Sequence, residues 1–165
     1  MNVKNIGIFL VSATALAACG GSGSNNSLSS TSIKVDGAYS LFEVSCSAGD
    51  LNPEAVPVFQ AQIDQNLTMT IAGSKISFSS KDSSNCTKTE EGRILKQTQN
   101  EIVTLKEKIS CSAQCQPQSC TPASSLDDVS TLQYQKTADG LIFIDSSEGA
   151  CLDSEAGLEI YFKLK

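Results

Sequence analysis

The chain has 165 residues, with 12 basic and 18 acidic side chains, and it contains neither His nor Trp. The formal net charge of −6 argues against nucleic acid as a partner, because an acidic surface repels phosphate groups. The lack of His removes the commonest general base and the commonest metal ligand of proteins.

The first 18 residues have the layout of a secretory signal peptide. Lys4 precedes an apolar run over residues 6–16, and the small residues Ala17 and Ala18 follow it. This run is too short for a membrane-spanning helix, which needs about 20 apolar residues. We therefore expect residues 1–18 to be removed on export.

The segment Leu16-Ala17-Ala18-Cys19 resembles the lipobox of bacterial lipoproteins. There, Leu stands three residues before the cysteine, small residues beside the cut suit the peptidase, and the thiol accepts the lipid. The resemblance implies that Cys19 becomes the first mature residue and carries acyl chains. Gly20, where Asp would retain a lipoprotein at the inner membrane in bacteria with the Lol system, implies outer-membrane delivery. The alternative is an ordinary signal peptide with an unrelated cysteine.

Residues 20–32 contain Gly, Ser, Asn and Thr with a single Leu. This composition predicts a flexible tether behind Cys19, with a span on the order of 20 Å. Residues 33–165 are then long enough for one domain with its own core.

Six further cysteines remain in the mature chain, and an even number in an exported protein predicts three disulfides. They are Cys46, Cys86, Cys111, Cys115, Cys120 and Cys151. A metal site is the alternative, because three of them are close in sequence. Their spacing differs from a Cys-x-x-Cys pair, however, so we expect disulfides, no metal and no cofactor.

Beyond the tether, the sequence predicts eight β-strands and no helix, because apolar and polar residues largely alternate. The predicted strands are residues 37–46, 59–71, 75–80, 85–98, 101–111, 129–136, 141–144 and 158–165. Residues 101–111 also fit a helical stripe, but their β-branched content favours a strand. The strand over residues 85–98 is expected to kink near Gly92.

Eight strands in an up-and-down order close naturally into a barrel, because closure removes exposed strand edges. The short connections, residues 73–74, 99–100 and 137–140, then lie at one end, and the long connections and all six cysteines lie at the other. A hairpin of the fourth and fifth strands would bring Cys86 close to Cys111 or Cys115, so we expect one of these bonds.

This layout, with Gly37-Ala38-Tyr39 opening the first strand, resembles lipocalin-like barrels over residues 37–165. A two-sheet β-sandwich is the alternative fold. The chain enters the first strand and leaves the last at the end with the short turns. We therefore expect that end to face the membrane and the disulfide-tied loops to point away from it.

No group of residues in the sequence makes a convincing catalytic site. Ser-Lys neighbours at 74–75 and 80–81 lie at strand ends, where polar residues are common. Glu90 and Glu91 are adjacent in a predicted strand and therefore point to opposite faces. The acidic residues between 145 and 155 do not match the Asp-x-Asp-x-Asp-Gly calcium loop, and we interpret them as a solvated loop.

We therefore expect a lipid-anchored, non-catalytic binding domain of the bacterial outer membrane. In one version the lipocalin-like resemblance implies a small apolar ligand inside the barrel. The residues facing it would be Met69, Ile71, Phe78, Leu105, Leu132, Phe143, Ile160 and Phe162. In the alternative, the disulfide-tied loops bind another protein, as an inhibitor or envelope scaffold, and an enzyme of unknown type is the third class. A cavity of roughly 300 Å³ would favour the ligand, and a filled barrel the loops.

Overall fold

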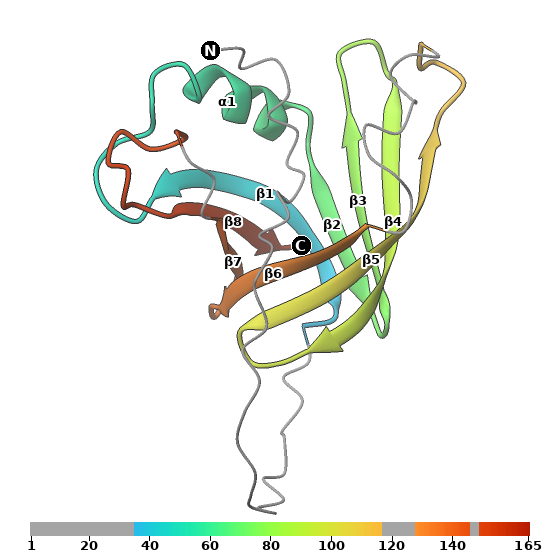
Figure 1. The fold of residues 1–165 in the computed structure, drawn as a ribbon. Coiled ribbons are helices and arrows are strands. Elements are labelled where there is room, and N and C mark those ends of the chain that lie inside the picture. The colour runs from blue at the N-terminus through green and yellow to red at the C-terminus, as the bar shows by residue number, and fades with distance from the viewer. Residues whose placement is uncertain (1–34, 117–127, 146–148) are drawn as a thin grey trace, which may run out of the picture.

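The computed structural model describes residues 35–116, 128–145 and 149–165 of the chain. Eight antiparallel strands follow one another around a closed barrel in sequence order (Figure 1). The predicted all-β, up-and-down fold is confirmed, and closure excludes the open sandwich. The signal peptide, Cys19, the tether and Cys120 lie outside the described residues.

One short helix accompanies the eight strands in the part of the chain that the structure describes. The elements are β1 (Gly37–Cys46), α1 (Val56–Asp64), β2 (Thr68–Ala72), β3 (Lys75–Lys81), β4 (Thr87–Gln97), β5 (Glu101–Cys111), β6 (Val129–Lys136), β7 (Gly140–Asp145) and β8 (Leu158–Leu164). The strand prediction for residues 101–111 is confirmed, since β5 pairs with strands on both sides.

The prediction of a long strand over residues 59–71 is wrong in its first half, which belongs to helix α1. Pro57 stands in the first turn of α1, where its fixed φ suits a helix. Phe59 and Ile63 lie four residues apart and pack against the core, so they share a helix face and also fit an alternating pattern. Asn66 then takes a left-handed φ of 51° and turns the chain into β2.

The barrel is uneven because two of its strand pairings are short. β1 pairs with β2 over residues 37–40 only, whereas it pairs with β8 from Tyr39 to Cys46. β5 pairs with β6 over residues 101–105 only, although it pairs with β4 along almost its whole length. The half formed by β2–β5 therefore separates from the half formed by β6–β8 and β1 toward the top of Figure 1, where α1 lies above β1.

We call the end with the β2–β3, β4–β5 and β6–β7 connections the turn end and the opposite end the loop end. The backbone amide of Lys165 donates to the carbonyl of Ala38 at 2.9 Å. The last strand therefore finishes beside the start of the first, at the turn end, as the sequence predicted.

The pairing of β4 with β5 shifts register between Glu91 and Gly92, at the position where the sequence predicts a kink. A Cβ atom added at Gly92 would lie 2.7 Å from the backbone oxygen of Leu105. Only glycine permits this close approach of the two strands.

The core lies inside the barrel and extends beneath α1. Two buried tyrosines close it near the turn end. The hydroxyl of Tyr39 donates to the carbonyl of Val35, and that of Tyr134 donates to the carbonyl of Thr98, each at 2.7 Å. These bonds satisfy the hydroxyls and tie the ends of strands to the core.

Candidate binding site at the loop end

Most of the predicted ligand-facing residues do line the barrel interior. Met69, Ile71, Phe143, Ile160 and Phe162 are buried there, and Phe78 and Leu132 pack against this cluster. The ring centroids of Phe78 and Phe162 are 6.4 Å apart, and those of Phe143 and Phe162 are 5.8 Å apart. Aromatic side chains from β3, β8 and β7 thus touch one another across the barrel, so this level of the interior is packed core.

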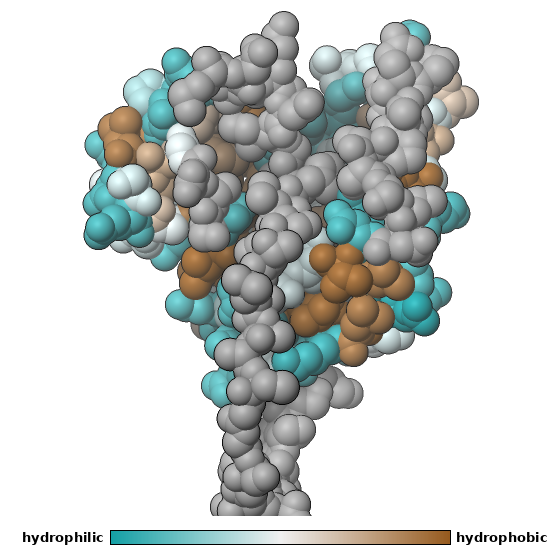
Figure 2. Space-filling model, in the orientation of Figure 1, coloured by the Kyte–Doolittle hydropathy of each residue, from teal (hydrophilic) through white to brown (hydrophobic). Residues whose placement is uncertain are grey.

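Leu105 lies instead on the outer wall. It alternates with the buried residues Ile102 and Thr104, and its cross-strand partner is Val129, which is 50% exposed. Ile109 shares the inward face of Glu90, but the bulge between Glu91 and Gly92 shifts the register of β5, so Leu105 faces outward and its predicted place in the interior is wrong. Figure 2 shows apolar surface over this part of the barrel.

A charged cluster lies on the inner face toward the loop end. Glu90 is paired with Phe78 on β3 and with Ile109 on β5. Its Oε1 lies 3.1 Å from Lys88 Nζ, its Oε2 lies 3.7 Å from Lys106 Nζ, and its side chain is only 10% exposed. A carboxylate buried this far requires such partners.

This cluster is not predicted by the sequence pattern. The pattern did predict that Glu90 and Glu91 point to opposite faces, and this is confirmed, since Glu90 is buried and Glu91 exposed. Lys88 and Glu90 are two residues apart on a strand, so the sequence does place them on one face. It does not show whether that face is the inner or the outer one.

Two disulfides join loop-end connections to the barrel. Cys46 at the end of β1 bonds Cys151, with Cα atoms 5.9 Å apart. Cys86 before β4 bonds Cys115 after β5, which is one of the two partners predicted for it. Cys111 is also disulfide-bonded. These disulfides indicate an oxidising, extracytoplasmic compartment.

The backbone strengthens the first of these attachments. Leu51 forms a β-bridge with Cys151, and the amide of Leu152 donates to the carbonyl of Asp50 at 3.0 Å. The segment after β1 and the segment before β8 are therefore held side by side at the loop end.

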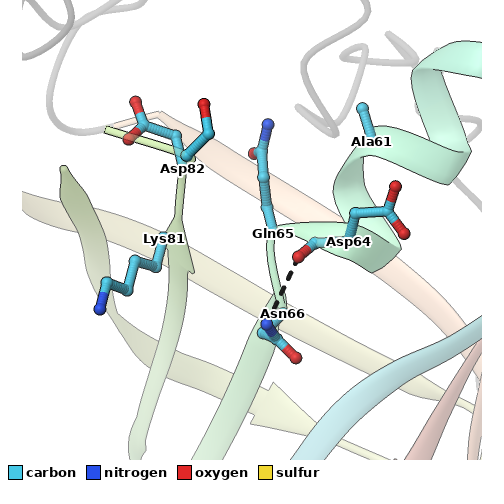
Figure 3. Close-up of a pocket in the computed structure, with 7 residues that line it drawn as sticks. Ala61, Asp64, Gln65, Asn66, Lys81 and Asp82 are labelled. Atoms are coloured by element: carbon cyan, nitrogen blue, oxygen red, sulfur yellow. Dashed lines mark hydrogen bonds between the residues drawn. The ribbon is translucent and has the colours of Figure 1, made fainter. Parts of the chain in front are cut away.

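A groove of about 360 Å³ opens between the end of α1 and the β3–β4 connection (Figure 3). It is lined by Ala61, Asp64, Gln65, Asn66, Lys81, Asp82 and Ser83. Figure 3 shows the Gln65 side chain rising between Asp82 and Ala61, while Lys81 points to the other side. This lining suits a polar group of a partner better than an apolar ligand.

Asp82 organises one wall of the groove. Its carboxylate accepts hydrogen bonds from the hydroxyl and the amide of Ser84, at 2.6 and 2.8 Å, and from the amide of Cys86 at 3.0 Å. The Ser84 hydroxyl, with these amides, holds the pKa of Asp82 below its usual value. Asp82 is therefore a fixed negative charge at neutral pH, and it orders the turn that leads to the Cys86–Cys115 bond.

Among the residues described, no group of three or more His, Cys, Asp or Glu side chains is placed to hold a metal ion. The described part of the chain contains no helix long and apolar enough to cross a bilayer. The chain matches no protein-family model, no curated protein and no solved structure.

Proposed function

We propose that this protein is a lipid-anchored, non-catalytic lipoprotein of the bacterial envelope that binds another protein through its loop end. The observation that supports this most directly is that the loop-end connections are held in place by disulfides while the barrel interior is packed. Both described disulfides fix loop-end connections, while aromatic side chains fill the barrel at the level of Phe162. Loops fixed before binding lose less entropy when a partner docks.

The charge of the loop end indicates the chemistry of the partner. Among the described residues, the connections of this end and the helix contribute the acidic residues Asp50, Glu54, Asp64, Asp82, Asp153 and Glu155, and the end of β3 contributes the basic residue Lys81. A surface with this charge steers basic partners toward it and disfavours acidic ones. The oxidising compartment and the lipobox at Cys19 support an envelope location, with the lipid on Cys19 as the anchor.

The test is photo-crosslinking in cells from single positions. A photoreactive residue replaces Ser83 or Leu152 at the loop end, and Ser74 or Ala138 at the turn end as matched controls. We expect one protein adduct of reproducible mass from the two loop-end positions and none from the controls. Equal labelling from both ends, or labelling from the turn end alone, contradicts the proposal.

A small apolar ligand in the barrel is the second candidate, because the two halves separate toward the loop end. Native mass spectrometry of protein purified without detergent tests this version directly. A bound small molecule that is lost in a Phe78→Ala variant, but retained in an outer-wall Leu105→Ala variant, would favour the ligand over the protein partner.

A further inference from the structure

Five lysines lie beside the three connections of the turn end or at the end of β8. They are Lys75, Lys96, Lys136, Lys163 and Lys165. This end therefore differs in charge from the acidic loop end, although the whole chain is acidic.

The carboxylates at the turn end are held by neighbouring groups. Asp36 accepts the amide of Gly73 at 2.8 Å, and Glu101 accepts Lys96 Nζ at 3.0 Å. Asp139 accepts the Thr137 hydroxyl at 3.2 Å and is also bonded by the hydroxyl of Tyr161. Among the described residues of the turn end, the five lysines outnumber these three acids, so their charge balance is positive.

Two exposed leucines lie among the lysines. Leu95 precedes Lys96 on β4 and is 50% exposed, and Leu164 stands between Lys163 and Lys165 and is 49% exposed. Exposed leucines next to lysines suit a lipid interface, where the apolar side chains enter the headgroup boundary and the ammonium groups remain at the phosphates.

We propose that the turn end, through Leu95, Leu164 and the surrounding lysines, rests on an anionic bilayer. This inference rests on the proposed lipid anchor, since the described chain begins at Val35, at the turn end, 16 residues after Cys19. A tether of this length spans on the order of 20 Å, so it holds the turn end at a high effective concentration near the membrane. Each lysine near an anionic surface favours binding by about fivefold. With the domain already held close to the membrane, such weak contacts are sufficient to orient it.

The absence of Trp from the natural chain permits a direct test. Single tryptophans are introduced as Leu95→Trp and Leu164→Trp at the turn end, and as Leu152→Trp at the loop end for the matched control. The lipidated proteins are placed in vesicles of brominated phosphatidylcholine with 30% phosphatidylglycerol, since bromine quenches tryptophan only on close approach. We expect at least twofold quenching at the turn end and almost none at position 152.

A second arm separates specific contact from net charge. Lys75→Glu with Lys165→Glu should abolish quenching of the Leu95→Trp variant, whereas the same charge change at Lys81 and Lys108, away from the turn end, should leave it intact. Loss of quenching in both pairs, or equal quenching at positions 95 and 152, overturns the inference. The mass of the purified protein reports the lipid separately. A missing lipid overturns the anchor and this inference with it, whereas a lipidated protein without turn-end quenching overturns this inference alone.

Discussion

At the scale of single residues, Glu90 is the side chain whose role is most specific to this barrel. Removing its carboxylate in Glu90→Ala takes an ionic partner from Lys88 and Lys106 on the inner face. We expect a loss of about 1–3 kcal/mol in the free energy of unfolding. Glu91→Ala, on the exposed face of the same strand, should change it by less than about 0.5 kcal/mol. Urea denaturation measures both, and equal effects would contradict the inward placement of Glu90.

Asp82 predicts part of the response to acid. Its pKa is lowered in the folded state, so the folded protein binds this proton less tightly than the unfolded chain. The corresponding stability is present above the unfolded pKa of about 3.9 and is lost as the pH falls through the lower folded value. We expect Asp82→Asn to lose less stability than the natural protein between pH 5 and pH 2. Thermal melting across this range is the measurement, with Asp50→Asn as control, and parallel curves for the Asp82→Asn variant and the natural protein would refute the prediction.

At the scale of elements, helix α1 is held by one buried aromatic side chain. Phe59 is 3% exposed, whereas Gln60, the next residue, is exposed. Phe59→Ala should cost about 3–5 kcal/mol through the cavity it leaves. Gln60→Ala should be nearly neutral, because alanine is a good helix former. Guanidinium unfolding followed by circular dichroism compares the two, and a Phe59→Ala cost near that of Gln60→Ala would mean that α1 does not pack on the core.

The strands of this barrel could largely be predicted from sequence, and the reason is visible in β8. Leu158, Ile160 and Phe162 are buried, and the residues between them point outward. The two-residue alternation in the sequence therefore corresponds to one buried face of the strand. Helix α1 could not be distinguished from a strand in this way. Phe59 and Ile63 are four residues apart, and this spacing fits both the two-residue period of a strand and the 3.6-residue period of a helix. The inward position of Glu90 could not be predicted because a sequence does not distinguish an inward charge from an outward one, although Glu90 pairs with Phe78 in regular register. The outward position of Leu105 could not be predicted because it depends on the bulge beside Gly92, whose register is set by contacts between strands.

At the scale of the whole molecule, the two described disulfides differ in the length of chain that they close. Cys46 and Cys151 are 105 residues apart, and Cys86 and Cys115 are 29 apart. Loop entropy alone predicts that losing the first costs about 1 kcal/mol more than losing the second. Paired Cys→Ser variants, compared by denaturant midpoint and slope, test this order. A larger loss from the 86–115 pair would indicate that local turn geometry, such as the hydrogen bonds to Asp82, outweighs chain entropy.

The anchor prediction also belongs to the whole molecule. Cys19→Ser removes the thiol that the lipobox resemblance identifies as the lipid acceptor. We expect this variant to retain its signal segment and to lose its labelling by radioactive palmitate in growing cells. Ser22→Ala, inside the tether, should be processed and labelled as the natural chain is. Continued palmitate labelling of the Cys19→Ser variant would overturn the interpretation of residues 16–19.

The pairing of β1 with β8 has a consequence for the order of folding during export. The first and last strands of the barrel are neighbours, so β1 lacks its longest partner until residues 158–164 have crossed the membrane. Until then, its pairing with β2 covers only residues 37–40. Contacts between such distant segments form slowly, because a long loop must close first. The Cys46–Cys151 bond spans almost the same interval, so its oxidation after translocation would lock this late closure in place.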